Sequence, residues 1–328
     1  MISDAEIEQV YQFALELGKN AGKLLLEAAQ KRMSGDVQLD EVEKLNSVDI
    51  VTKTDEEVEA FIRTSILEKY PDHKFVGEES YSKGSSKEYL IDDSPTWCID
   101  PLDGTVNFAH LSPFYCVSIG FLVQSQPVIG IVCAPFLQQT FSARRDHGAW
   151  LNETVRLPLQ RNPVPPLPPT APKGCIFSCE WGKDRRDIPD GNLARKVESF
   201  VNMATELGGK GGKGGMVHGV RSLGSATLDL CYVAMGGFDI WWEGGCWEWD
   251  VCAGICLLQE AGGLVTTANP PEDVDHAPVP PAKLGGRLYL AIRAAGDGEG
   301  ESGREAQERV VREVWMRVRK LDYERPGA

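Results

Sequence analysis

The segment Asp100-Pro101-Leu102-Asp103-Gly104-Thr105 places two carboxylates three residues apart, directly after the apolar run Trp97-Cys98-Ile99. Hard cations such as Mg²⁺ bind oxygen ligands, commonly one or two carboxylates completed by water and substrate phosphate. A strand ending in this segment would offer two carboxylates, a turn carbonyl and backbone N–H groups within a small volume. The segment therefore predicts a metal and phosphate site, with a surface turn as the alternative because Asp, Pro and Gly are common turn residues.

Two other acidic positions also lie at the ends of apolar elements. Glu78 and Glu79 end the run that begins at Phe75. Asp250 lies in Trp249-Asp250-Val251-Cys252-Ala253-Gly254, at the predicted first turn of a buried helix that continues over 255–261. Three acidic positions of this kind, far apart in the chain, indicate one converging site more than three solvated turns.

These three motifs, in this order and at these separations, resemble those of the inositol monophosphatase family. The resemblance runs from about Asp49 to Ala261, is weaker over the first 45 residues and fades after Gly263. It implies a layered α-β-α-β-α sandwich, within the α/β (α+β) class, and a Mg²⁺-dependent, lithium-sensitive phosphatase. It also implies a homodimer.

The resemblance implies the metal ligands, residue by residue, for two or three Mg²⁺ ions per site. Glu78 and Asp100 would hold the first ion together with the carbonyl of Leu102. Asp100 would bridge to a second ion, completed by Asp103 and Asp250. Two cations about 3.5–4 Å apart stabilise both the attacking and the leaving oxygen of an in-line displacement.

The resemblance also implies the groups that act on water and phosphate. The hydroxyl of Thr105 and the carboxylate of Glu78 would help to activate the attacking water, and Asp55 would act through Thr105. Thr54 and Asp55 are also residue types that cap helices, so a structural role for Asp55 is supported as well as the functional one is. Gly104 and Thr105 would present backbone N–H groups to phosphate at a helix N-terminus, where unpaired donors favour an anion.

Substrate contacts are expected from a second group of positions that match the family. Glu243 would accept hydrogen bonds from substrate hydroxyls, and a solvated acid beside two tryptophans is the alternative. The loop beside it would line the same pocket, through Gly224, Ser225 and Ala226. The phosphate side would again involve Asp103 and Asp250.

Two residues depart from the family pattern and bear on the identity of the substrate. Lys183 stands where the animal inositol enzymes have a serine, and Trp247 replaces a histidine. The lysine favours a more anionic substrate, whereas the tryptophan could narrow the pocket. Hydrolysis of myo-inositol monophosphate is the preferred function. The alternatives are another ester (a nucleotide 3′-phosphate, a sugar phosphate or a quinate-linked metabolite) and a non-catalytic regulator that binds phosphometabolites.

Helix and strand patterns alternate along the chain. Capping boxes at Ser3–Glu6 and Thr54–Glu57 predict two amphipathic helices, the second ending near Tyr70. Further helices are expected over 191–206, 225–235 and 304–321, and strands over 74–76, 96–99, 116–123, 128–134, 140–143, 176–179, 237–242, 264–267 and 288–292.

The organisation expected is a single domain, 1–328, with two halves. The N-terminal α+β half covers about 1–160 and the C-terminal α/β half about 174–328, joined by the proline-rich segment 163–172. The glycine- and lysine-rich segment 208–215 is interpreted as a surface insertion because no P-loop context surrounds it.

Composition limits the classes of partner. The net charge of −14 disfavours nucleic acid, which is bound through basic patches. No apolar run approaches the ~20 residues that span a bilayer, and no signal pattern opens the chain. The nine cysteines show no zinc-type spacing. These observations favour a cytoplasmic enzyme acting on a small-molecule phosphate monoester.

Overall fold

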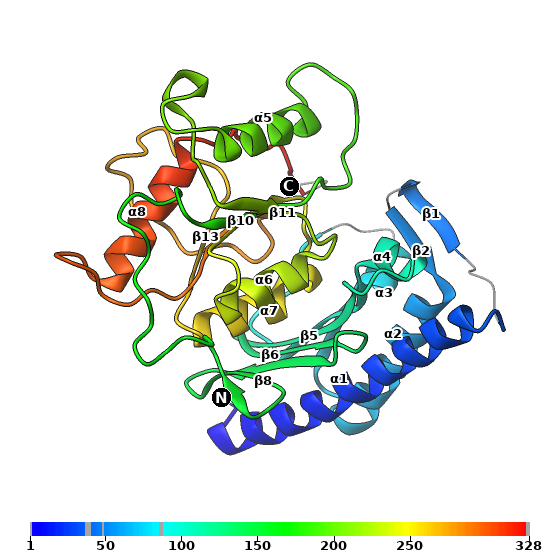
Figure 1. The fold of residues 1–328 in the computed structure, drawn as a ribbon. Coiled ribbons are helices and arrows are strands. Elements are labelled where there is room, and N and C mark those ends of the chain that lie inside the picture. The colour runs from blue at the N-terminus through cyan, green and yellow to red at the C-terminus, as the bar shows by residue number, and fades with distance from the viewer. Residues whose placement is uncertain (1, 37–40, 48, 85–87, 326–328) are drawn as a thin grey trace.

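The computed structural model describes residues 2–36, 41–47, 49–84 and 88–325. Within these residues the strands form sheets of seven, five and two strands, and helices lie outside and between the two larger sheets (Figure 1). The order of layers is α1 and α2, the seven-stranded sheet, α6 and α7, the five-stranded sheet, and then α5 and α8. This arrangement confirms the predicted layered sandwich of the α/β class.

The seven-stranded sheet has the order β3-β4-β5-β6-β7-β8-β9. Its strands are β3 Lys74–Gly77, β4 Thr96–Asp103, β5 Cys116–Val123, β6 Gln126–Ala134, β7 Gln139–Arg144, β8 Gly148–Leu151 and β9 Val155–Arg156. The helices of this half are α1 Asp4–Met33, α2 Lys53–Lys69, α3 Glu78–Ser82 and α4 Thr105–Ala109.

The five-stranded sheet has the order β11-β10-β12-β14-β13. Its strands are β10 Ile176–Ser178, β11 Gly219–Arg221, β12 Ile240–Gly244, β13 Leu264–Thr266 and β14 Leu288–Ile292. The helices of this half are α5 Asn192–Ala204, the 3₁₀ turn η1 Lys210–Gly212, α6 Ala226–Met235, α7 Glu248–Glu260 and α8 Gly303–Trp315.

Alternating side chains explain why each sheet is covered on both faces. In β4, Trp97 and Ile99 pack toward α1 and α2, whereas Cys98 packs toward α7. In β12, Trp242 packs toward α8, whereas Trp241 packs toward the central helices. Strands buried on both faces must be apolar at successive positions, and for this reason they appeared in the sequence as continuous apolar runs.

The start of α2 corrects one predicted boundary. The helix is capped at Thr52, whose backbone N–H donates to Asp55 Oδ2 at 2.8 Å, so the capping box spans 52–55 and not 54–57. Asp55 has the required acceptor at the third helical position, and Thr52 has the extended backbone that an N-cap adopts. The prediction for α1 was right, because Ser3 and Glu6 form the capping box.

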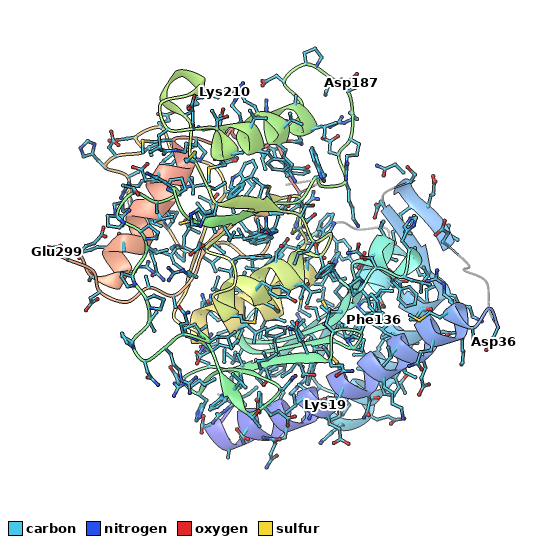
Figure 2. All side chains as sticks on the ribbon, in the orientation of Figure 1. Lys19, Asp36, Phe136, Asp187, Lys210 and Glu299 are labelled. Carbon is cyan, nitrogen blue, oxygen red and sulfur yellow. The ribbon has the colours of Figure 1, made fainter. Side chains whose placement is uncertain are left out.

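Other elements differ from the prediction in detail. The hairpin β1 Glu41–Asn46 and β2 Asp49–Thr52 was not predicted. α8 ends at Trp315, six residues before the predicted end at Leu321. All nine cysteines are free and buried. The segment around Lys210 forms a short turn at the end of the molecule that carries α5 (Figure 2).

Within the described residues every helix is too short or too polar to cross a lipid bilayer.

Candidate active site

Three elements bring their acidic residues to one point between the two halves. Glu78 is the first residue of α3, Asp100 lies in β4, and Asp250 is the third residue of α7. One carboxylate oxygen from each of these three residues lies within 4.8 Å of the others. The residues come from positions 78, 100 and 250, so the convergence predicted from the sequence is present in the structure.

Two glycines let α7 approach the seven-stranded sheet closely. A Cβ at Gly130 of β6 would lie 2.3 Å from the carbonyl oxygen of Ala253. A Cβ at Gly120 of β5 would lie 2.4 Å from Cys252 Sγ. Any larger residue would push α7 away from the sheet, and with it Asp250 at the start of the helix.

The three carboxylates lie close together, with Asp100 buried and the other two partly buried. Asp100 is 1% exposed. Burial raises the pKa of Asp100 well above its usual range, and the charge of Glu78 raises it further. Burial and the charge of Asp103 likewise raise the pKa of Asp250. A buried group of like charges is stable when a cation neutralises it, when it takes up protons, or both.

Lys44 supplies part of the missing positive charge. Its ammonium donates to Glu78 Oε1 at 2.9 Å and to Glu79 Oε1 at 2.8 Å. Burial works to raise the pKa of Glu78, but the positive charges of Lys44 and Lys183 outweigh burial, and its pKa is lowered. Glu79 has the opposite balance, since burial and the neighbouring Glu78 raise its pKa to about 7.

Asp103 joins the two halves of the fold. Its carboxylate accepts the hydroxyl of Ser225 and the backbone N–H of Thr227, the latter at 3.0 Å, both at the start of α6. Thr227 in turn donates its hydroxyl to the carbonyl of Asp250 at 2.7 Å. Burial outweighs these hydrogen bonds and raises the pKa of Asp103 to about 6.

The hydroxyl of Thr105 contacts the carboxylate of Asp55. Thr105 Oγ1 is 3.2 Å from Asp55 Oδ1 and 3.1 Å from the carbonyl oxygen of Leu102. The second oxygen of Asp55 accepts from Thr52. Asp55 therefore both caps α2 and contacts Thr105, so the structural and the functional interpretations of Asp55 are compatible. Burial raises its pKa to about 6.

The turn between β4 and α4 needs glycine. Gly104 has φ +88°, and a Cβ there would lie 2.6 Å from the carbonyl oxygen of Phe114. The left-handed backbone favours glycine, which has no Cβ to strain it. This turn lets α4 begin at Thr105 directly beside the acids, with the N–H groups of 104 and 105 at the start of the helix.

Glu243 is engaged inside the protein. It is 1% exposed, forms an ion pair with Lys196, and accepts the backbone N–H of Glu180 at 2.8 Å. Burial raises the pKa of Glu243, and the charge of Lys196 opposes that rise. A substrate hydroxyl would have to share these acceptor oxygens, so the predicted contact between Glu243 and substrate stays a prediction.

The loop 222–225 is held by Glu180. The carboxylate of Glu180 accepts the backbone N–H groups of Leu223 at 2.6 Å and Gly224 at 2.9 Å, and the hydroxyl of Ser222 at 2.7 Å. Ser225 caps α6 and Ala226 is its first residue. The predicted pocket residues Gly224–Ala226 thus form one fixed corner next to Asp103.

The two residues that depart from the family pattern have defined surroundings. Lys183 is half exposed, and its ammonium lies 2.6 Å from Asp49 Oδ1. The backbone N–H of Trp247 donates to Asp250 Oδ2 at 2.7 Å. The Trp247 ring stacks on Trp249 at 5.5 Å and lies under the guanidinium of Arg287 at 3.9 Å.

Sequence reasoning missed Lys44, Glu180 and Lys196. Lys44 lies on a hairpin that no periodicity signalled. Glu180 directly follows the predicted strand 176–179, an end position like that of the predicted acids, and this signal could have identified it. Lys196 is fully buried on α5. Its partner Glu243 is 47 residues away, and no local pattern encodes that contact.

The donor set fits a hard divalent cation. Clustered carboxylate oxygens, together with a neighbouring carbonyl, are ligands typical of Mg²⁺, and the pKa is raised for Asp100 and Asp250. Bound there, the cation would supply the positive charge that this cluster lacks.

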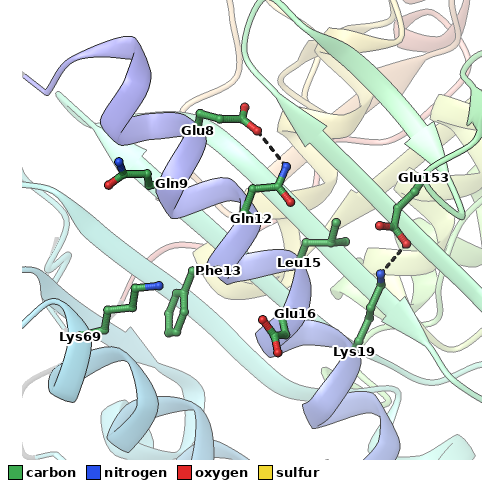
Figure 3. A pocket seen from close by; sticks show the side chains of 9 residues that line it. All are labelled: Glu8, Gln9, Gln12, Phe13, Leu15, Glu16, Lys19, Lys69 and Glu153. Atoms are coloured by element: carbon green, nitrogen blue, oxygen red, sulfur yellow. Dashed lines mark hydrogen bonds and ion pairs between the residues drawn. The ribbon is translucent and has the colours of Figure 1, made fainter.

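A surface hollow elsewhere contains none of these groups. It has a volume of about 620 Å³ and is lined by α1, the end of α2 and Glu153 (Figure 3). Its side chains form local pairs, Lys19 with Glu153 and Gln12 with Glu8. The chemistry is therefore expected at the acidic cluster.

The layered helices and sheets, with a carboxylate cluster between them, indicate an α/β protein with a site suited to a divalent cation. Comparisons with known proteins identify its family. The inositol monophosphatase family model matches residues 6–319, so the chain belongs to the inositol monophosphatase family. The chain is 66% identical to Protein qutG of Emericella nidulans, over 99% of this chain and 98% of that protein.

Two further comparisons cover nearly the whole chain. The chain is 63% identical to the quinic acid degradation cluster protein x of Neurospora crassa, over 98% of this chain and 97% of that protein. The structure of an inositol monophosphatase from Anabaena (Nostoc) has a TM-score of 0.67 and 27% identity, covering 97% of this chain and 98% of that one.

Proposed function

We propose that this protein is a Mg²⁺-dependent phosphatase that hydrolyses myo-inositol monophosphate to myo-inositol and phosphate. The observation that carries the proposal is the meeting of Glu78, Asp100 and Asp250 within 4.8 Å, beside the contact between Thr105 and Asp55. Family membership supports phosphate monoesters as the substrate class. From the same membership we propose a lithium-sensitive, cytoplasmic homodimer.

Different residues of this chain would bind the metal ions, activate the attacking water and position the groups that do so. Glu78, Asp100, the carbonyl of Leu102, Asp103 and Asp250 would hold two or three Mg²⁺ ions, which act as Lewis acids on phosphate and water. The Thr105 hydroxyl would orient the attacking water through a hydrogen bond, and the carboxylate of Glu78 would accept the proton that the water loses. Asp55 holds the Thr105 hydroxyl in place.

Other groups would bind the ester and exclude water. The N–H groups of Gly104 and Thr105 would face the phosphate, since the first N–H groups of a helix have no partner within it. The corner formed by Gly224, Ser225 and Ala226 would line the alcohol side, with Glu243 and Lys183 beyond it. In this arrangement the departing alcohol faces the C-terminal half.

A panel of phosphate esters, assayed with and without Mg²⁺, tests the proposal. We expect Mg²⁺-dependent phosphate release, fastest with inositol monophosphates. Release from no ester would contradict the proposed hydrolysis. Release that is fastest with a sugar phosphate or a nucleotide 3′-phosphate would contradict the inositol substrate alone.

Lys183 favours a second candidate substrate, a ring polyol phosphate that also carries a carboxylate. In the described residues Asp49 is the hydrogen-bond acceptor of this half-exposed ammonium, which leaves N–H donors for a substrate anion. The name of the Neurospora crassa relative refers to the degradation of quinic acid, a carboxylated ring polyol.

A substitution separates the two substrates. If Lys183 binds a carboxylate, Lys183→Ser should raise KM for a quinate phosphate about tenfold and leave KM for inositol monophosphate within about twofold, because a charge-assisted hydrogen bond contributes about 1.5–3 kcal/mol. Lys19→Ser is the matched control, since Lys19 is also a half-exposed lysine in an ion pair but lies far from the acids. Equal effects of Lys183→Ser on both substrates would rule out carboxylate recognition.

A further inference from the structure

The chain beyond residue 319, where the family match ends, runs back toward the acidic cluster. Reciprocal hydrogen bonds fix its path. Leu321 exchanges two bonds of 2.8 Å with the side chain of Asn269, and Asp322 exchanges two of 2.8 Å with the side chain of Asn192. The ring of Tyr323 then packs against Gly244 and Gly245, directly before α7.

Arg325 lies at the end of this path, between the two halves of the fold. Its guanidinium forms an ion pair with the carboxylate of Glu248 and lies 2.9 Å from the hydroxyl of Tyr81. It also donates to the carbonyl of Glu88 at 3.3 Å. The aromatic faces of Tyr89 and Trp247 lie 5.3 and 5.0 Å from the guanidinium.

The partners of Arg325 are close in sequence to two of the proposed metal ligands. Glu248 begins α7, two residues before Asp250. Tyr81 lies on α3, three residues after Glu78. One guanidinium therefore holds together the helix starts that carry Glu78 and Asp250, although these helices belong to different halves.

The ion pair between Arg325 and Glu248 is buried, unlike a surface salt bridge. The side chain of Arg325 is 8% exposed and that of Glu248 is 0% exposed. Removing one partner of a buried ion pair leaves an uncompensated charge. Arg287 supports the same arrangement, since it donates to the carbonyls of Glu324 and Gly245, both at 2.9 Å.

We propose that Arg325 is a positioning residue for the metal site, and that the segment 320–325 is a built-in clamp which fixes the distance between Glu78 and Asp250. The clamp acts through Tyr81 and Glu248. This inference rests on the proposed function only in taking Glu78 and Asp250 as metal ligands.

Calorimetric titration of the full-length protein with Mn²⁺, without substrate, tests the clamp. Arg325→Ala should weaken Mn²⁺ binding about tenfold or more, because partners that orient metal ligands contribute about 10- to 100-fold in affinity. Arg325→Lys, which keeps the charge, should recover part of that loss. Arg319→Ala is the control, because Arg319 pairs with Glu198 and Asp190 on the surface and should leave Mn²⁺ affinity unchanged.

The double variant Glu248→Gln with Arg325→Met removes both charges of this pair, so it guards against a single variant that fails to fold. It should also bind Mn²⁺ about tenfold more weakly while circular dichroism shows a native fold. Wild-type Mn²⁺ affinity in the folded Arg325→Ala or double variant would overturn the proposal, as would the absence of Mn²⁺ binding to the wild type. A protein that releases phosphate from no ester but shows the Arg325→Ala loss would support the clamp and contradict the proposed hydrolysis.

Discussion

Asp100 combines near-complete burial with three acidic neighbours, Asp103 on its own strand, Glu78 on α3 and Asp250 on α7. The ionised carboxylate of Asp100 destabilises the metal-free fold, and a bound cation would offset that cost. A residue of this kind stabilises the bound state at the expense of the metal-free fold, as functional sites commonly do. Substitution of Asp100 should therefore affect catalysis and stability in opposite directions.

For Asp100→Asn we expect Mg²⁺-dependent kcat/KM to fall by about a thousandfold or more, equivalent to about 4 kcal/mol of activation free energy. The melting temperature of the metal-free protein should rise, because one of the crowded charges is gone. Steady-state kinetics and thermal denaturation in EDTA measure the two effects. The exposed residue Asp187, at the α5 end of the molecule (Figure 2), gives the control Asp187→Asn, which should change neither quantity.

Thr105→Ala should separate water activation from metal binding. The substitution removes the hydroxyl held by Asp55, so kcat should fall by about 100-fold, the lower range for general acid–base groups. Mg²⁺ affinity should stay within about threefold, since the carboxylates are unchanged. Thr205→Ala, which removes an exposed hydroxyl bonded to Val201, is the control. If Thr105→Ala kept near wild-type kcat, the role assigned to this hydroxyl would be wrong.

At the scale of elements, the site is built where helices begin. α3, α4, α6 and α7 start at Glu78, Thr105, Ala226 and Glu248, and each start lies next to a proposed ligand or a residue bonded to one. The first N–H groups of a helix lack partners within it. Helix capping and ligand placement therefore use the same residues.

Ser225 illustrates this double use. Its hydroxyl accepts the N–H of Leu228 at 3.2 Å, which caps α6, and donates to Asp103. Ser225→Ala should lower the free energy of unfolding by about 1 kcal/mol. It should also weaken Mg²⁺ binding by about tenfold, the lower range for loss of a group that orients a metal ligand. Urea unfolding and metal titration measure these effects.

Ser302→Ala provides the matched control for Ser225→Ala. Ser302 caps α8, far along the chain from the acids, and accepts the N–H of Glu305 at 3.3 Å. It should cost a similar free energy of unfolding without changing Mg²⁺ affinity. Equal metal affinities in the two variants would show that Ser225 has a capping role alone.

At the scale of the whole molecule, the proposed metal ligands come from both halves. Glu78, Asp100 and Asp103 come from the N-terminal half and Asp250 from the C-terminal half. A cation bound by these residues would couple the halves thermodynamically, since a ligand that binds only the folded state stabilises it. Chelation should therefore lower the melting temperature of the entire fold.

The size of that effect should depend on pH. The pKa of Asp103 is raised by burial to about 6, so the metal-free fold retains a proton that the unfolded chain loses near its ordinary value of 3.8. The stability contributed by this proton is present below the ordinary value and is lost as pH rises through about 6. Mg²⁺ binds the ionised carboxylate, so its affinity rises over the same range.

We therefore expect the increase in melting temperature on adding Mg²⁺ to be larger at about pH 7.5 than at about pH 5. Thermal denaturation with saturating Mg²⁺ and with EDTA at each pH measures it. Asp103→Asn should flatten the dependence. If the increase in melting temperature were the same at both pH values, or larger at about pH 5, Mg²⁺ binding would not be accompanied by proton release from these carboxylates.

The sequence patterns by themselves determined the mixed helix-and-strand class, many of the helices and strands, and the acids of the cluster, whereas the layered sandwich followed from the resemblance to a family. The patterns could do so because these properties are local. Asp100 and Asp103 are close because they lie three residues apart on one strand, and the apolar run before them reflects a strand buried on both faces. The capping box at 52–55 shows the limit, since two overlapping threonine and acid patterns differ only in the backbone each adopts.

Only the tertiary structure determined which basic side chain pairs with which acidic side chain. Lys44 meets Glu78, Lys196 meets Glu243, and Arg325 meets Glu248 across 34, 47 and 77 residues of chain. The first two pairs join β1 to α3 and α5 to β12, and the third forms because hydrogen bonds from Asn269 and Asn192 bring the C-terminal segment back to the start of α7. Each depends on the packing of whole elements, which fixes distances that no local spacing contains.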